Sequence, residues 1–174
     1  YSPASDAANR RRLTLLSDFA DALAQPGDLS LLYQPRIDLR TGRQTGAEAL
    51  LRWRHPTLGD ISPAEFVPLL EQTALARPMT EWVLGAALDQ QAAWRALGAS
   101  IAVSVNVSAR NLEEADFLPR LAAHLGRRGL PAEDLELELT ETALIRNAEQ
   151  VLVQLNGLRD MGVTIAIDDF GTGY

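Results

Sequence analysis

The stretch Val163-Thr-Ile-Ala-Ile-Asp-Asp-Phe-Gly-Thr-Gly-Tyr174 is the part of the sequence on which the interpretation of the fold rests. Five apolar or β-branched residues lead directly into two neighbouring carboxylates, and two glycines follow. This order predicts a buried strand that ends in an acidic tight loop. Because α/β folds place their chemistry at such strand ends, we expect Asp168 and Asp169 to belong to a functional site.

Upstream of this stretch, strand-like and helix-like segments alternate along the chain. The apolar patterns predict strands over residues 29–39, 45–54, 101–108, 135–140 and 163–169, with a hairpin turn at 40–43. They predict helices over residues 9–25, 63–73, 78–97, 116–128 and 147–161. Strands that alternate with helices of this length form a largely parallel sheet with right-handed crossovers.

The composition is that of a single soluble domain with a substantial core. The 174 residues are 47% hydrophobic, and the net charge of -7 argues against a broad nucleic-acid surface, so we expect no DNA partner. The absence of cysteine excludes disulfides, thiolate metal sites and cysteine nucleophiles. It also fits a reducing compartment, and we expect a cytoplasmic location, with membrane attachment of a longer parent protein left open.

The first 28 residues are interpreted as a linker and an N-terminal helix, followed by a partial domain over residues 29–174. Residues 1–8 resemble a linker, and leucines at helical spacing predict an amphipathic helix from Asn9 to Gln25, ended by Pro26-Gly27. A signal peptide is the competing interpretation of the arginines and leucines here. Asp18 and Asp21 interrupt the apolar run that such a peptide needs, which favours the helix.

Side chains alternate in character along the predicted strands. The strand at 101–108 has an apolar face made of Ile101, Val103, Val105 and Val107. Its other face is small or polar and carries Ala102, Ser104, Asn106 and Ser108. The two later strands follow the same rule, with apolar faces made of Leu135, Leu137, Leu139, Val163, Ile165 and Ile167.

Two arrangements of these faces are open. The polar faces could meet water, as in an antiparallel sheet with one solvated side. Alternatively, the strands form a barrel whose apolar faces meet the surrounding helices and whose inner faces carry the polar residues. Parallel strands joined by helices are normally covered on both faces, and this favours the barrel.

In a barrel, strand alternation directs Glu48, Asn106, Glu138 and Asp168 into one lumen. Carboxylates gathered in a low-dielectric interior repel one another, so a positive charge is required there. A divalent cation is one answer, because carboxylate and amide oxygens suit Mg²⁺ or Mn²⁺.

Internal ion pairs are the other answer, with Arg36, Arg52 and Arg54 as the available cations. Asp169 would point away from Asp168 by strict alternation, but a turn at the strand end can direct it towards a second ion. A pair of cations would suit in-line attack of water on a phosphodiester. The residues alone leave both answers open.

Four motifs in this order resemble those of the EAL domain family of cyclic di-GMP phosphodiesterases. They are Glu48-Ala-Leu-Leu-Arg-Trp53, Asn106-Val-Ser-Ala-Arg110, Glu138-Leu-Thr-Glu141 and Asp168-Asp-Phe-Gly-Thr-Gly-Tyr174. Tyr33-Gln34-Pro35 fits as well. The resemblance covers about residues 29–174 and implies a modified TIM (β/α)8 barrel, present as roughly its first five strands and their helices. It also implies hydrolysis of cyclic di-GMP to linear pGpG, with Mg²⁺ or Mn²⁺, as a pair of ions, for cofactor.

The resemblance also implies roles for individual residues. It makes metal ligands of Glu48, Asn106, Glu138 and Asp168, and places Asp169 at the second metal. It assigns Arg52 to a substrate phosphate, Gln34 to another substrate contact, and Glu141 to support of the loop after the acidic strand. A structural ion pair for Arg52 and a strand-edge contact for Gln34 are the competing interpretations.

The family pattern implies parts that would follow Tyr174: the general-base lysine, a later glutamate ligand and a later glutamine. We therefore expect residues 1–174 alone to hydrolyse cyclic di-GMP poorly. A cyclic di-GMP receptor or signalling scaffold that binds without cleaving is the alternative function. The resemblance further implies a homodimer, and by analogy the parent protein carries an adjacent regulatory or diguanylate cyclase domain.

The remaining features receive structural interpretations. Gly171-Thr172-Gly173 is a weak phosphate-loop signal, because the two preceding acids would repel a phosphate. His55 is interpreted as structural and His124 as a surface residue. The tryptophans at 82 and 94 are interpreted as helix core together with Val83, Leu84, Leu88 and Leu97.

Overall fold

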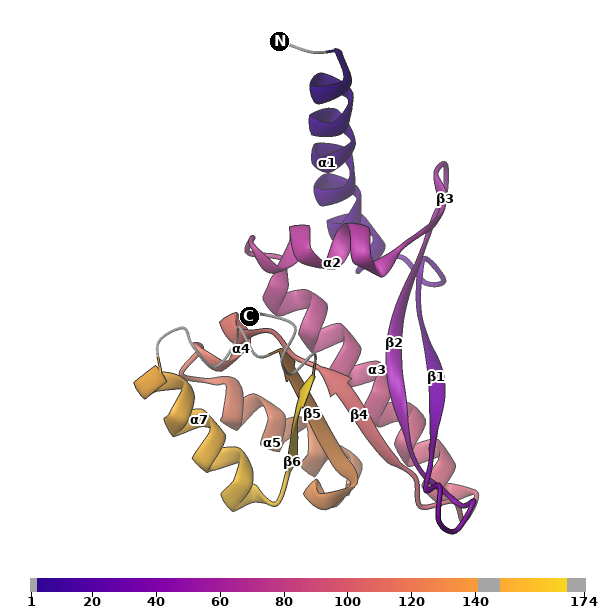
Figure 1. The fold of residues 1–174 in the computed structure, drawn as a ribbon, viewed down its shortest axis with the longest axis vertical. Helices are drawn as coiled ribbons and strands as arrows, with labels where there is room; N and C mark the ends of the chain where they lie inside the picture. The colour runs from indigo at the N-terminus through magenta and orange to yellow at the C-terminus, as the bar shows by residue number, and fades with distance from the viewer. Residues whose placement is uncertain (1–2, 141–147, 169–174) are drawn as a thin grey trace.

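A curved, mostly parallel sheet organises the chain. The computed structural model describes the backbone of residues 3–140 and 148–168 (Figure 1). The sheet has the order β1-β2-β4-β5-β6, and a short strand β3 pairs with β2 outside this path. The strands are β1 (Leu29–Ile37), β2 (Gln44–His55), β3 (Gly59–Ile61), β4 (Ala102–Asn106), β5 (Leu135–Thr140) and β6 (Thr164–Asp168). β1 is antiparallel to β2, whereas β2, β4, β5 and β6 are parallel to one another.

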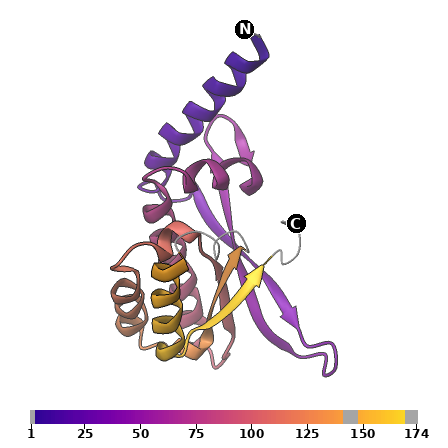
Figure 2. The ribbon, with the colours of Figure 1, turned by 60° about the vertical axis from the view of Figure 1, so that its left-hand side comes forward.

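Helices cover one face of this sheet. They are α2 (Pro63–Glu71), α3 (Ala76–Ala96), α4 (Ala109–Leu112), α5 (Phe117–Arg128) and α7 (Ala148–Met161), and a 3₁₀ turn η1 (Ala132–Asp134) precedes β5. Figure 2 shows α3, α5 and α7 on the same side of the strands. The expected alternation of strands and helices with a largely parallel sheet is therefore confirmed, and it has the arrangement of a partial TIM-like barrel.

The apolar faces of the strands form the main core, as expected from their alternation. Leu135, Leu137 and Leu139 of β5 are fully buried, and Val103 and Val105 of β4 pack with them. On the opposite face of β5, Glu136 and Glu138 keep partial exposure. The barrel arrangement explains this segregation, because helices bury one face and the other lines the concave side.

A second core lies at the end of the molecule where α1 (Pro3–Ala22) meets the sheet. Phe19 of α1 contacts Trp53 edge-on, with ring centroids 5.2 Å apart, and stacks on Phe66 of α2 at 5.7 Å. The expected N-terminal helix begins earlier than predicted, at Pro3 and not at Asn9, so the segment interpreted as a linker is helical from Pro3 onward. The first turns of α1 project away from the body of the molecule (Figure 1). Their sequence therefore lacks the regularly spaced apolar residues by which a packed helix is predicted.

Two short elements and two exposed residues differ from expectation. β3 and α4 were not predicted, since three or four residues give no readable periodicity. Leu97, expected in the helix core, is 84% exposed because α3 ends one residue before it. Ile167 of β6 is 45% exposed and so is not buried with Val163 of the same face.

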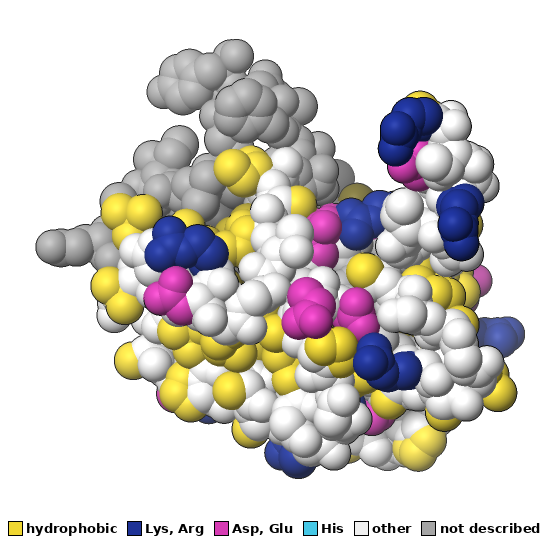
Figure 3. All heavy atoms as spheres, turned by 90° about the horizontal axis from the view of Figure 1, so that it is seen from below, with side chains coloured by type: hydrophobic (Ala, Val, Ile, Leu, Met, Phe, Trp, Pro, Cys, Tyr) yellow, Lys and Arg dark blue, Asp and Glu magenta, His cyan; other side chains and the backbone are white. Residues whose placement is uncertain are grey.

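The described basic side chains do not form a continuous patch on one face of the molecule (Figure 3). On the face shown in Figure 3, basic side chains lie singly among neutral, apolar and acidic ones. Within the described ranges, no helix has the length and apolar character needed to cross a membrane.

Candidate active site

Glu48 and Asn106 meet on the concave face of the sheet. Asn106 is the last residue of β4, and its Nδ2 donates a hydrogen bond of 2.9 Å to Oε1 of Glu48 in β2. The parallel register that pairs Glu48 with Ser104 places the two side chains side by side. This hydrogen bond leaves the amide oxygen of Asn106 available to bind another group.

Glu138 of β5 lies beside this pair. Its Cα is the register partner of Asn106, and only 11% of its side chain is exposed. Burial raises the pKa of the Glu138 carboxyl, and the charges of Glu48 and Glu136 act in the same direction. The structure thus brings together three of the four residues that alternation directed into one lumen.

Arg36 of β1 brings a positive charge next to these acids. Its Nη1 forms an ion pair with Glu136 Oε1 and lies 3.5 Å from Glu138 Oε1. The hydrogen bond to Glu136, with the charges of Glu136, Glu138 and Glu48, raises the pKa of Arg36. Of the arginines considered for internal pairing, Arg36 is the one that the structure pairs with these acids.

The two residues expected to bind substrate lie on the same face. Gln34 is exposed and is the register partner of Glu48, and Arg52 follows Glu48 by four residues along β2. Arg52 Nη1 donates to the backbone oxygen of Leu51 at 2.9 Å. Among the described residues it forms no ion pair with a barrel acid, so the structural ion pair considered for it is not observed.

The remaining expected site residues fall at the edge of the described ranges. The backbone of Asp168 ends β6, where it is the register partner of Thr140 at the end of β5. Both strands therefore lead towards the same edge of the sheet as β4. Asp169 and Glu141 lie outside the described residues.

The donor chemistry of this cluster fits a hard divalent cation. Two carboxylates and one amide oxygen come from three neighbouring strands, without a nitrogen or sulfur ligand. Among the described residues alone, no three His, Cys, Asp or Glu side chains gather closely enough to hold a metal ion. A complete ligand set therefore needs a contribution beyond Glu48, Asn106 and Glu138.

A buried polar anchor holds the turn that follows Asn106, and sequence reasoning missed it. Asn111 of α4 is fully buried, and its Oδ1 accepts hydrogen bonds from Ser108 Oγ at 2.8 Å and Thr80 Oγ1 at 3.0 Å. Because Thr80 lies in α3, this contact fixes the end of β4 against the helix layer. The Ser-x-x-Asn spacing at the start of α4 was the available signal.

The two histidines both have structural partners. His55 is buried, and its Nε2 lies 2.9 Å from Asp18 Oδ2 of α1, in keeping with its structural interpretation. The surface interpretation of His124 is wrong, since this side chain is buried between α3 and α5 and lies 2.8 Å from Glu81 Oε2. The alternation of side chains along the strands gives no information about a contact between two helices, so the sequence did not indicate this pair.

Acidic and amide side chains on the concave face of an incomplete, mostly parallel barrel define a TIM-barrel-like α/β protein with a candidate active site at the carboxyl ends of its strands. The chain matches the EAL domain family over residues 17–174, and it belongs to that family. The expected family and fold class are thereby confirmed.

Proteins similar to this chain include two phosphodiesterases and an EAL domain. The chain is 48% identical over 174 residues to a cyclic di-GMP phosphodiesterase of Pseudomonas aeruginosa, with all of this chain and 30% of that protein aligned. It superposes on the PaMucR phosphodiesterase in complex with c-di-GMP with a TM-score of 0.86 at 42% identity, over 92% of this chain and 65% of that one. The FimX EAL domain gives a TM-score of 0.82 at 28% identity, over 90% and 63% of the two chains. The chain thus spans less than two thirds of the length of each of these relatives.

Proposed function

We propose that this chain forms part of the catalytic barrel of a metal-dependent phosphodiesterase that hydrolyses cyclic di-GMP to linear pGpG. The observation that carries the proposal is the meeting of Glu48, Asn106 and Glu138 on the concave face, with the hydrogen bond of 2.9 Å between the first two. Support comes from the family membership and from the similarity to the PaMucR phosphodiesterase, whose structure is a complex with c-di-GMP.

The metal ligands are proposed to be Glu48, Asn106, Glu138 and Asp168, with Asp169 serving a second ion. Mg²⁺ or Mn²⁺ would there polarise the phosphate and make water a better nucleophile. The chain's own contribution is to fix the ligand directions. Asn106 Nδ2 holds Glu48 by its hydrogen bond, and burial keeps Glu138 away from competing water.

Gln34 and Arg52 are proposed to bind the substrate. Both lie on the strand face that carries Glu48, with Gln34 in β1 and Arg52 in its antiparallel partner β2. The guanidinium of Arg52 can meet a phosphate with two parallel donors. Glu141 is proposed to support the loop after β6 and so to keep the two aspartates in place.

Hydrolysis by the full-length protein tests the proposal. With Mg²⁺ or Mn²⁺ we expect conversion of cyclic di-GMP to pGpG, measured by chromatography of the nucleotides. Glu48→Ala should lower turnover by at least about a hundredfold, because a ligand is lost. Glu133→Ala removes an exposed carboxylate of η1 and is the matched control, with turnover unchanged. Tight binding of cyclic di-GMP without formation of any pGpG would contradict the proposed phosphodiesterase activity. It would establish the alternative function, a receptor or scaffold that binds without cleaving.

Residues 1–174 alone are proposed to hydrolyse cyclic di-GMP poorly. The described sheet has five strands on its main path, whereas a closed barrel of this class needs about eight. The lumen wall opposite Glu48 and Glu138 would then be incomplete. Turnover by the purified segment at the rate of the full-length protein would refute this expectation.

Partners are proposed on the same basis. The full-length protein is proposed to form a homodimer and to carry an adjacent regulatory or diguanylate cyclase domain, with α1 as the connection. The projection of the first turns of α1 away from the barrel is consistent with that connection (Figure 1). Light scattering coupled to size-exclusion chromatography measures the oligomeric state directly.

A further inference from the structure

The side chain of Arg36 crosses the concave face of the sheet. Arg36 lies in β1, yet it reaches Glu136 and Glu138 in β5, with β2 and β4 between them in the strand order. Such a reach requires a strongly curved sheet, because it spans three strand spacings. Arg36 therefore ties the two sides of the partial barrel together across its lumen.

A glycine in β2 makes room for this crossing. Gly46 in β2 is the register partner of both Arg36 and Ala102. A Cβ at Gly46 would lie 3.2 Å from Arg36 Nη2 and 3.0 Å from the backbone oxygen of Ala102, closer than side chains normally approach. The glycine is thus needed where the guanidinium passes over β2.

Arg36 contacts two acids at different distances. It hydrogen-bonds Glu136, whose side chain is 18% exposed, and stands at the longer distance of 3.5 Å from Glu138. Glu136 has no role in the proposed ligand set, although it lies two residues before a proposed ligand on the same face. The contact of Glu136 with Arg36 holds the guanidinium near Glu138, but Arg36 and Glu138 do not form a close ion pair.

We propose that Arg36 and Glu136 are positioning residues that set the affinity of the acidic site for its divalent cation. Arg36 offsets the repulsion among Glu48, Glu136 and Glu138 when no cation is bound. Glu136 retains Arg36 and so keeps the guanidinium from competing with the cation for Glu138. This inference rests on the proposed function, because it requires Glu138 to be a metal ligand.

The proposal predicts opposite effects for the two partners. In Glu136→Gln the guanidinium is released to Glu138, and Mn²⁺ affinity should fall by about tenfold or more. In Arg36→Met a competing positive charge is removed, and Mn²⁺ affinity should rise by about tenfold. Arg36→Lys keeps the positive charge, so its Mn²⁺ affinity should stay within about threefold of the native value.

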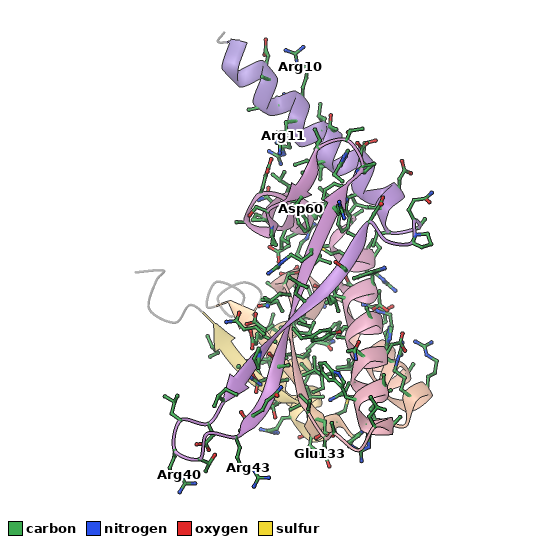
Figure 4. The ribbon with its side chains drawn as sticks, turned by 90° about the vertical axis from the view of Figure 1, so that its right-hand side faces the viewer. Arg10, Arg11, Arg40, Arg43, Asp60 and Glu133 are labelled. Atoms are coloured by element: carbon green, nitrogen blue, oxygen red, sulfur yellow. The ribbon has the colours of Figure 1, made fainter. Side chains whose placement is uncertain are left out.

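Isothermal titration of the full-length protein with Mn²⁺ alone measures these affinities without any turnover. Unfolding in urea without metal gives a second readout, in which Arg36→Met should be less stable than the native protein. Glu133→Gln and Arg43→Met are the matched controls for loss of one charge. Both are exposed, and Figure 4 shows Arg43 beside the loop of the β1–β2 hairpin and Glu133 at the same end of the molecule. Glu133 belongs to η1, which precedes β5.

The outcomes separate the inference from the proposed function. If the native protein binds no Mn²⁺, the metal-dependent function fails and this inference fails with it. If the native protein binds Mn²⁺ but the two variants shift the affinity in the same direction, or not at all, Arg36 and Glu136 are only structural. Should Arg36→Met not fold, a Glu136→Gln affinity equal to the native one still overturns the inference.

Discussion

At the scale of single residues, buried polar side chains with several partners hold separate segments of the chain together. His55 is an example, because its Nδ1 accepts hydrogen bonds from the backbone N–H groups of Thr57 and Leu58, both at 3.2 Å. Its proton therefore lies on Nε2 and is donated to Asp18 of α1. One buried side chain thus holds the turn before β3 and the docked end of α1.

Replacement of His55 should weaken the fold measurably. We expect His55→Ala to lower the free energy of unfolding by about 2 to 3 kcal/mol, because it removes these hydrogen bonds and leaves space beside Trp53. Asp18→Ala, at a carboxylate that is 40% exposed, should cost less than about 1 kcal/mol. Urea titrations of both variants provide the comparison, and equal losses would show that the Asp18 contact accounts for the whole effect.

The burial of Tyr33 leads us to expect that the protein loses stability at alkaline pH. Burial, with the charge of Asp89 in addition, raises the pKa of the Tyr33 hydroxyl from 10.0 to about 12. Below about pH 10 the hydroxyl is neutral in both states; between the two pKa values the unfolded chain ionises first, so stability falls as pH rises. We expect Tyr33→Phe to lose less stability than the native protein between about pH 9 and pH 11. Parallel losses in urea titrations at the two pH values would contradict this assignment.

At the scale of elements, strand alternation was the most reliable guide. It placed Glu48, Asn106 and Glu138 on one face, because side chains of a strand must point alternately to its two sides. It could not predict that Arg36 crosses the lumen or that His124 pairs with Glu81, since both contacts depend on how separate elements pack. Element ends were predicted less well, as the early start of α1 and the exposure of Leu97 show.

The contact between α5 and α7 provides a test of helix packing. A Cβ at Gly157 in α7 would lie 2.3 Å from Leu118 Cδ1 of α5. We expect Gly157→Ala to destabilise the protein by about 1 to 3 kcal/mol, despite the better helix propensity of alanine. Combining it with Leu118→Ala should cost less than the sum of the single changes, because the clash is then absent.

Gly126 supplies the control for this prediction. It lies in α5, and a Cβ there would meet nothing within 4 Å. Gly126→Ala should therefore stabilise the protein by about 0.5 to 1 kcal/mol. Thermal or urea unfolding measures all four variants. If Gly157→Ala is stabilising to the same extent, Leu118 moves aside freely and the packing constraint does not exist.

At the scale of the whole molecule, the two hydrophobic cores have different roles. The larger core lies between the strands β4 and β5 and the helix layer. It fixes the strand ends that carry the candidate site. The smaller one, built around Phe19, Trp53 and Phe66, attaches α1 to the barrel. The curvature of the sheet brings β1 and β5 close enough for Arg36 to span the lumen.

The most direct measurement is an anomalous difference map from crystals of the full-length protein soaked in Mn²⁺. It should show a peak about 2.1 to 2.2 Å from oxygen atoms of Glu48, Asn106 and Glu138. Glu136 should lie outside this shell, still paired with Arg36. A well-ordered Mn²⁺ peak elsewhere, or none at these three residues under saturating Mn²⁺, would contradict the metal site on which the proposed hydrolysis of cyclic di-GMP depends.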